Sequence, residues 1–212
     1  MAVVGIVPAG GSGERLGADR PKAFAVCAGR PLLAWSLDAL LAVCRRVVVA
    51  VPPGYERAPD RVRGGESRSA SVRAALEAAP EATIAVVHDA ARPLVTADLV
   101  RRCVAALDDD DALDGVVAAV PVIDTIHRVD PAGVIEATPE RSLLWAAQTP
   151  QVFRAEVLRR ALDVDDDVLA SATDDAVLVR AAGGRVGVVE SFPGNIKVTT
   201  PGDLRVVESA LC

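Results

Sequence analysis

Aromatic residues are scarce in this chain of 212 residues, where phenylalanine, tryptophan and tyrosine together make up 3%. Proteins that bind single-stranded nucleic acid without sequence preference stack bases on aromatic side chains, so this chain offers few such platforms. The formal net charge of −6 also disfavours nonspecific binding to a phosphate backbone. We therefore expect no nucleic-acid partner.

Long apolar segments and clustered cysteines are lacking as well. The first apolar run, Ala2 to Pro8, has no basic n-region and is too short for a signal peptide or a membrane span. The four cysteines show no Cys-x-x-Cys spacing, which disfavours a metal cluster or a disulfide framework; they are Cys27, Cys44, Cys103 and Cys212. We expect a cytoplasmic protein without a membrane partner, in a reducing compartment.

Lysine is the rarest of the charged residues. Of the 23 basic residues only Lys22 and Lys197 are lysine, which leaves 21 arginines. A compact ammonium on a flexible stem fits a crowded phosphate site better than a planar guanidinium does. The two lysines are therefore candidate phosphate ligands, and the alternative is that they are accidents of composition.

The order of apolar segments predicts one α/β domain over residues 1–212. Apolar residues make up 51% and charged residues 25%, as in a folded globular protein. Buried strands are expected over residues 3–7, 47–51, 83–87, 115–120 and 186–189. Helices are expected over 31–43, 67–79 (capped by Ser67 or Ser69), 96–107 (capped by Thr96), 153–162, 174–182 and 201–211. This alternation predicts a Rossmann-like, mainly parallel sheet with helices on both faces, which binds ligands beyond the carboxyl ends of its strands.

One stretch, about residues 122–145, interrupts the alternation. It has two β-like pieces, Thr125–Val129 and Val134–Ala137, separated by the turn sequence Asp130-Pro131-Ala132-Gly133. This pattern predicts a protruding β-hairpin, either as an extension of the sheet or as an arm that grips another subunit. The acidic runs Asp108–Asp111 and Asp165–Asp167 are interpreted as solvated loops rather than metal sites.

A glycine-rich loop follows the first strand. It reads Pro8-Ala9-Gly10-Gly11-Ser12-Gly13-Glu14-Arg15-Leu16-Gly17 and is followed by Arg20-Pro21-Lys22. Glycines let backbone N–H groups approach phosphate oxygens, and Arg15 and Lys22 add positive charge. Leu16 replaces the third glycine of a dinucleotide fingerprint, and no Gly-Lys-Ser/Thr follows as in a Walker A loop. A phosphate site is the favoured interpretation, and a plain strand-to-helix connection is the alternative.

These residues resemble the signature loop of sugar-phosphate nucleotidyltransferases. More narrowly, the chain resembles the 2-C-methyl-D-erythritol 4-phosphate cytidylyltransferase family of the non-mevalonate isoprenoid pathway. Further segments in family order support the resemblance: Gly64–Val72, His88–Pro93, Pro121–Thr125, Gln148–Gln151, Thr173–Asp175 and Asn195–Thr199. Ser12 and Glu14 depart from residues common in the family.

The resemblance implies that a substrate phosphate attacks the α-phosphorus of CTP and that pyrophosphate leaves. Because the nucleophile is already an anion, catalysis reduces to positioning and charge stabilisation, and His88 is expected to be structural. By carry-over, Arg15 and Lys22 stabilise the transition state, Asp89 holds Mg²⁺ or another divalent cation, and Lys197 orients the acceptor.

The remaining carried-over residues bind the two substrates. The nucleotide would lie on Pro8, Ala9, Gly10, Gly11, Gly13, Gly65, Glu66, Ser71, Ala90 and Arg92. The acceptor would contact Thr149 and Thr173 together with Lys197. The resemblance also implies a homodimer with arm exchange, in which Thr125 and Arg141 bind the partner's sugar phosphate; a salt bridge at the rim is the alternative for Arg141.

Other functions stay open from the sequence alone. A cytidylyltransferase for another polyol phosphate, such as ribitol 5-phosphate, would share most of these motifs. A nucleotide-binding protein without catalysis is a rival of a different class, which the two retained lysines disfavour. A Rossmann oxidoreductase is disfavoured by Leu16.

Overall fold

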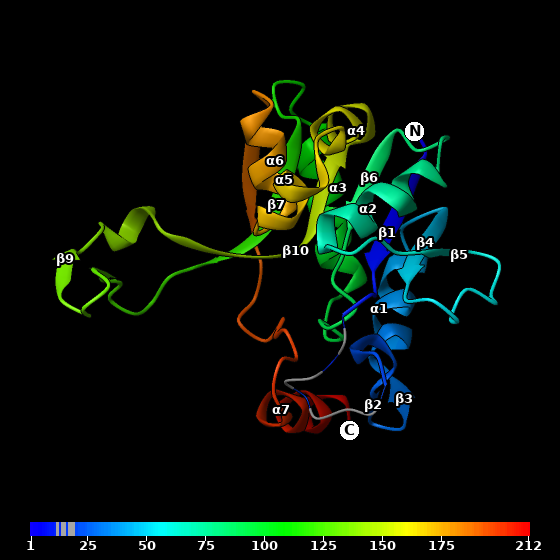
Figure 1. Ribbon diagram of the computed structural model, residues 1–212, viewed down its shortest axis with the longest axis horizontal. Coiled ribbons are helices and arrows are strands. Elements are labelled where there is room, and N and C mark those ends of the chain that lie inside the picture. Colours follow the sequence, from blue (N-terminus) through cyan, green and yellow to red (C-terminus); the bar gives the residue numbers. More distant parts are fainter. Residues whose placement is uncertain (12, 14–15, 17–19) are drawn as a thin grey trace.

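A mixed, mostly parallel sheet forms the centre of the molecule (Figure 1). The structure is a computed structural model that describes residues 1–11, 13, 16 and 20–212. In that part of the chain seven strands pair in the order β11-β7-β10-β6-β1-β4-β5. Their bounds are β1 (Val3–Pro8), β4 (Arg46–Val51), β5 (Arg61–Arg63), β6 (Ile84–Val87), β7 (Gly115–Pro121), β10 (Trp145–Arg154) and β11 (Val186–Glu190). The predicted α/β class with a mainly parallel sheet is confirmed.

Strand β10 is the exception, because it runs antiparallel to both of its neighbours, β6 and β7. The sequence predicted a helix from Phe153, which is wrong for its first two residues: the strand continues through Arg154, and the helix begins at Ala155. Pro150 lies where the pairing of β10 with β7 shifts register, between Ala147 and Gln151. A strand tolerates proline at such an interruption, so Pro150 concealed the strand.

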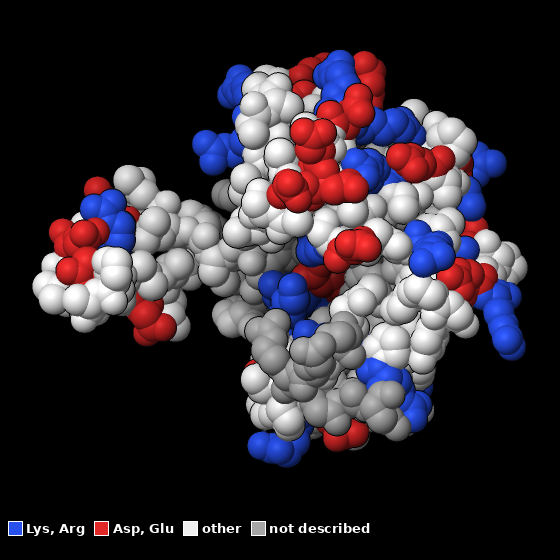
Figure 2. Space-filling model, in the orientation of Figure 1, with Lys and Arg blue, Asp and Glu red and all other residues white. Residues whose placement is uncertain are grey.

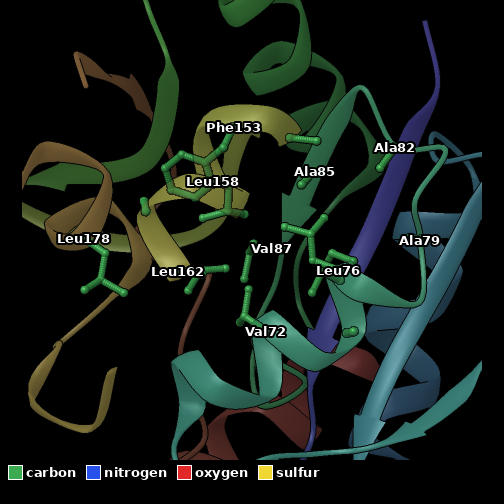
Figure 3. Close-up of a cluster of buried hydrophobic side chains, with 14 of the residues drawn as sticks. Val72, Leu76, Ala79, Ala82, Ala85, Val87, Phe153, Leu158, Leu162 and Leu178 are labelled. Carbon is green, nitrogen blue, oxygen red and sulfur yellow. The ribbon is translucent and has the colours of Figure 1, made fainter. Parts of the chain in front are cut away.

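Helices cover both faces of the sheet. Their bounds are α1 (Leu32–Leu41), α2 (Arg68–Glu77), α3 (Ala97–Asp108), α4 (Ala155–Leu162), α5 (Asp166–Ser171), α6 (Asp175–Ala181) and α7 (Pro201–Leu211). One apolar cluster packs α2, α4, α5 and α6 against one face, with Phe153 fully buried among them (Figure 3). The other packs α1 and α3 against the opposite face. Successive side chains of a strand point to opposite faces of the sheet, so Phe153 packs in the first cluster and its neighbour Val152 in the second.

Close packing fixes the residue opposite Phe153. A Cβ atom on Gly115 would lie 2.3 Å from Cδ1 of the Phe153 ring, so only glycine leaves room for the ring at this position of β7. The two residues are register partners in the β7–β10 ladder.

Polar side chains start several helices. Ser67 and Thr96 accept hydrogen bonds from backbone N–H groups three residues on, which confirms Thr96 and selects Ser67 over Ser69 as the cap of α2. Thr200 and Asp203 form a capping box at α7. The interpretation of Asp165–Asp167 as a loop is wrong, because Asp165 is the N-cap residue and the next two residues open α5. Acidic residues in a first helical turn are favoured by the helix dipole.

The interrupting stretch is an arm that projects from the sheet between β7 and β10 (Figure 1). It holds the hairpin strands β8 (Arg128–Val129) and β9 (Ile135–Ala137), shorter than the predicted pieces, and a 3-10 helix, Arg141–Leu143. Large apolar side chains of the arm lie exposed, among them Ile123 at 81% and Leu143 at 74%. The predicted hairpin is confirmed.

The C-terminal helix lies at the end of the molecule next to the short hairpin β2 (Val26–Cys27) and β3 (Arg30–Pro31). A third cluster joins Leu16, Cys27 and Leu32 to Val198 and Val207. It thereby fixes the segment 195–199 beside the glycine-rich loop. Within the described residues, no helix has both the length and the apolar character needed to cross a membrane.

Candidate active site

A cavity of about 360 Å³ opens where β1 and β6 end. This volume lies in the range of small-molecule sites, and its place beyond the carboxyl ends of parallel strands is the one expected for this architecture. Figure 2 shows acidic and basic side chains side by side in the hollow on this face. The cavity is lined by Pro8, Ala9, Gly10, Gly11, Gly13, Leu16, Lys22, Ala23, Gly65, Glu66, Ser67, Arg68, Ser71, Asp89, Ala90, Ala91, Lys197 and Thr199.

The glycine-rich loop leaves β1 and returns on itself. Gly13 has a φ of +83°, in the left-handed region that favours glycine, and a Cβ there would lie 3.2 Å from the backbone N of Lys22. The N–H of Lys22 donates to the carbonyl of Gly11 at 3.0 Å. This fold-back brings Lys22, the first residue of a 3-10 helix (Lys22–Phe24), to the cavity wall. Arg15, the other predicted cation of this loop, lies outside the described residues.

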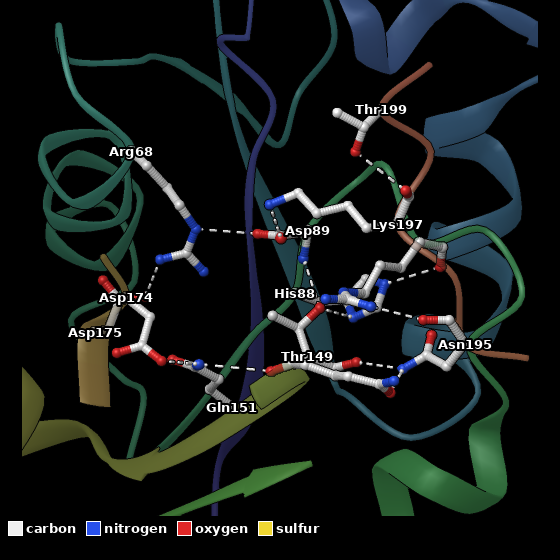
Figure 4. Close-up of polar contacts among 12 residues, drawn as sticks. Arg68, His88, Asp89, Thr149, Gln151, Asp174, Asp175, Asn195, Lys197 and Thr199 are labelled. Carbon is white, nitrogen blue, oxygen red and sulfur yellow. Dashed lines mark hydrogen bonds and ion pairs between the residues drawn. The ribbon is translucent and has the colours of Figure 1, made fainter. Parts of the chain in front are cut away.

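Asp89 follows β6 after one residue, His88, and lies between two cations (Figure 4). Its Oδ1 accepts from Nε of Arg68 at 3.0 Å, and its Oδ2 pairs with Nζ of Lys197 at 2.7 Å. Burial by itself would raise the pKa of the Asp89 carboxyl, but the two cations outweigh it and hold that pKa well below its usual range. Asp89 is therefore ionised and faces the cavity.

Arg68 is the site residue that the sequence did not single out. It opens α2 directly after the capping Ser67, and it also pairs with Oδ2 of Asp175 at 2.6 Å. Asp175 opens α6 and is fully buried. The segment Thr173–Asp175 supports the family resemblance in the sequence. Only the folded chain shows that the carboxylate of Asp175 pairs with Arg68.

Buried hydrogen bonds of His88 and Thr149 hold the backbone of Asp89 in place. Nε2 of His88 lies 3.2 Å from the carbonyl of Arg92, which can only accept, so this nitrogen carries the proton. Nδ1 then accepts from the hydroxyl of Thr149 at 3.0 Å, and that hydroxyl accepts the N–H of Asp89 at 3.1 Å. Burial lowers the pKa of His88 to about 4, so the ring is neutral and structural, as expected.

Buried hydrogen bonds also engage residues predicted to touch substrates. The hydroxyl of Thr149 is engaged with His88 and Asp89, and the residue is 3% exposed. Nη1 of Arg92 donates to the carbonyl of Asn195 at 2.6 Å, which ties the end of β6 to the segment that carries Lys197. Neither residue lines the cavity, and their contacts with substrates stay predictions.

The other wall of the cavity comes from the start of α2. The hydroxyl of Ser71 lies 3.0 Å from the carbonyl of Ser67 and 3.2 Å from that of Gly65. A Cβ on Gly65 would lie 2.5 Å from the Cβ of Ala70, so the chain passes close to the helix only because residue 65 is glycine. Glu66 and Ala90 also line the cavity, and their contact with a nucleotide stays a prediction.

Three predicted acceptor ligands lie away from the cavity of their own chain. Thr125 and Arg141 belong to the arm, where both are exposed, and Nη1 of Arg141 donates to the carbonyl of Ile123 at 2.8 Å. Thr173 is exposed just before α6. Their roles stay predictions.

Asp89 is the buried carboxylate of the cavity, and it is suited to a divalent cation. Each carboxylate oxygen has two lone-pair positions, and each oxygen of Asp89 has accepted one donor, so Asp89 keeps capacity for a metal. Mg²⁺ is usually held by one or two carboxylates together with substrate phosphates, so the arrangement fits that ion. Among the described residues, no group of three or more His, Cys, Asp or Glu side chains is placed to bind a metal without substrate.

A glycine-rich loop, two lysines and one carboxylate at the edge of a mainly parallel sheet define a nucleotidyltransferase. The family model described as 2-C-methyl-D-erythritol 4-phosphate cytidylyltransferase matches residues 3–212. The chain belongs to this family.

Individual relatives agree with the family model over nearly the whole chain. The chain is similar to the 2-C-methyl-D-erythritol 4-phosphate cytidylyltransferase of Nocardia farcinica, with 44% identity over 99% of this chain and 94% of the relative. It is 40% identical to that of Microcystis aeruginosa, over 97% of each chain. The crystal structure of the Thermus thermophilus enzyme superposes with a TM-score of 0.83, at 35% identity over 99% of this chain and 98% of that one.

Proposed function

We propose that this protein transfers the cytidylyl group of CTP to 2-C-methyl-D-erythritol 4-phosphate. An oxygen of the acceptor phosphate attacks the α-phosphorus of CTP, and the bond to the β-phosphate breaks. The products are 4-diphosphocytidyl-2-C-methyl-D-erythritol and pyrophosphate. The observation that carries the proposal is the convergence of Lys22, Asp89 and Lys197 on one cavity beside the glycine-rich loop.

The site supports a reaction without a general base. The acceptor phosphate is already an anion, and both ring nitrogens of the nearby His88 are engaged in buried hydrogen bonds. Lys22 would stabilise charge on the α-phosphoryl oxygens, together with Arg15. Backbone N–H groups of Gly10, Gly11 and Gly13 would hold the triphosphate.

A divalent cation, Mg²⁺ in the first instance, would be held by Asp89 together with phosphate oxygens of CTP. When bound, such an ion neutralises charge on the triphosphate and the leaving pyrophosphate. Lys197 pairs with Asp89 in the structure through an ammonium on a flexible stem, and its side chain is 43% exposed. It would turn from Asp89 to the acceptor phosphate and orient the attack, with Thr149 and Thr173 as further acceptor contacts.

The base would lie against Gly65, Glu66, Ser71, Ala90 and Arg92. Gly65 and Ser71 line the cavity, where backbone groups and the Ser71 hydroxyl would supply hydrogen-bond partners for the edge of a pyrimidine. Pyrophosphate release measured with CTP, ATP and GTP in turn tests this assignment. We expect a strong preference for CTP, and equal turnover with either purine nucleotide would reject the proposed pocket.

We further infer that the protein is a single domain that works as a cytoplasmic homodimer with arm exchange. The exposed apolar side chains of the arm support a partner surface, and the three buried cysteines are free thiols, as suits a reducing compartment. In the dimer, Thr125 and Arg141 would bind the acceptor phosphate in the partner's cavity. Arg141 would leave the carbonyl of Ile123 to do so.

Subunit mixing tests this arrangement. Arg141→Ala and Lys22→Ala proteins should each be nearly inactive. Mixed under conditions of subunit exchange, they should regain activity, because some heterodimers then carry one cavity with both residues intact. If exchange is demonstrated and no activity returns, the arm does not act across subunits.

A further inference from the structure

Arg68 links the cavity to a buried carboxylate on another helix. Its Nε donates to Asp89 at 3.0 Å and its Nη1 to Asp175 at 2.6 Å, and Figure 4 shows the guanidinium between α2, the end of β6 and the start of α6. The side chain also lines the cavity, where 26% of its surface is exposed. One guanidinium thus holds a carboxylate in the cavity and a second one outside it.

The buried partner is costly for the fold. Asp175 is fully buried, and its Oδ1 has no hydrogen-bond partner among the described residues. A buried ion pair can often be replaced by apolar side chains of similar volume without loss of stability, whereas removal of one partner alone costs about 3–5 kcal/mol. Stability therefore does not explain why a charged pair stands at this position.

The pair has a clear effect on Asp89. Four charges alternate in sign along one row: Asp175, Arg68, Asp89 and Lys197. When Lys197 turns to an acceptor phosphate, Arg68 is the described cation that still holds Asp89 in place. Asp175 in turn balances the charge of Arg68 and holds its guanidinium against α6.

We propose that Arg68 and Asp175 are positioning residues that fix the direction of the Asp89 carboxylate toward the cavity. They act through Asp89 and do not touch the reacting atoms. This inference rests on the proposed cytidylyl transfer. It adds a pair of residues from α2 and α6 to the strand end and loops that form the site.

Three variants separate positioning from a merely structural role. Arg68→Lys keeps one positive charge for Asp175, but a single ammonium cannot hold two carboxylates in the geometry of the guanidinium. Asp175→Asn removes the balancing charge, and Arg68→Gln combined with Asp175→Asn makes the buried pair neutral. Arg73→Gln is the matched control, because Arg73 lies on the same helix and pairs at 2.6 Å with Asp166 at the surface.

Each protein is assayed for its thermal unfolding midpoint, for binding of CTP with and without Mg²⁺ by calorimetry in the absence of acceptor, and for kcat and KM. Arg68→Lys should unfold near the wild-type midpoint, gain less CTP affinity from Mg²⁺ and lose about 10- to 100-fold in kcat, as loss of a partner behind a metal ligand does. The double variant should recover stability relative to Asp175→Asn and stay slow. The control should match the wild type in all assays.

Recovery of both stability and wild-type kcat in the double variant would overturn the proposal, since the pair would then be structural only. Wild-type Mg²⁺-dependent CTP binding in Arg68→Lys would also overturn it. Should Arg68→Lys not fold, the double variant decides. If the wild type binds Mg²⁺ and CTP in an Arg68-dependent way but transfers nothing to the acceptor, the proposed function fails and the positioning role stands.

Discussion

Acidification should destabilise the protein through one buried histidine. His88 is fully buried and its pKa is lowered to about 4 by burial, against an ordinary value near 6.5 in the unfolded chain. Between these values the unfolded chain binds a proton that the native protein does not. The contribution of the neutral His88 ring to the free energy of unfolding is therefore complete above pH 6.5 and is lost as the pH falls toward 4. A pKa difference of about 2.5 at about 1.4 kcal/mol for each pH unit gives roughly 3.5 kcal/mol in full, of which about 3 kcal/mol is lost by pH 4.

Urea unfolding at several pH values between 7 and 4 measures this effect. His88→Gln should be less stable than the wild type at pH 7, and the difference in the free energy of unfolding should shrink by about 3 kcal/mol by pH 4. His127→Gln, at an exposed position on the arm, is the control and should follow the wild type at every pH. If the difference in the free energy of unfolding between wild type and His88→Gln stays constant with pH, the claim that His88 is neutral in the native protein is refuted.

Three further substitutions test the site and the core. Asp89→Asn should leave the protein folded and raise the Mg²⁺ concentration for half-maximal activity by about tenfold or more; an unchanged titration would count against its metal role. Lys22→Met should lower kcat by about 10²-fold, while Lys197→Met should also raise the acceptor KM. Arginine should rescue neither position fully, and wild-type kinetics of both arginine variants would show that the lysines are accidental. Phe153→Ala should cost about 3–5 kcal/mol in the free energy of unfolding, and a loss below about 1 kcal/mol in chemical denaturation would contradict its central place in the core.

Local sequence was sufficient for features that follow a strand directly. The buried run before Pro8 and the run before His88 and Asp89 predicted strand ends, and strand ends of a parallel sheet share one edge. Lys22 and Lys197 stood out by composition, and both line the cavity. Apolar spacing predicted the other main helices and strands in the right order, with errors of a few residues at their ends, but it missed β5, β10 and α5.

What the sequence did not predict depends on contacts between distant residues. Arg68 was one of 21 arginines, and its partner Asp175 is 107 residues away. Strand β10 was concealed by Pro150, which is tolerated only because the pairing shifts register there. Thr149 was selected for its motif, yet only tertiary structure shows that its hydroxyl holds His88 and the backbone of Asp89.

The central claim is that the acceptor is 2-C-methyl-D-erythritol 4-phosphate. The most direct measurement compares kcat/KM for pyrophosphate release with CTP, Mg²⁺ and either this acceptor or ribitol 5-phosphate, with the cytidylyl product identified in each case. The account predicts rapid, saturable release and the diphosphocytidyl product with 2-C-methyl-D-erythritol 4-phosphate, and a far lower kcat/KM with ribitol 5-phosphate. A higher kcat/KM with ribitol 5-phosphate, or no release with either acceptor, would contradict it.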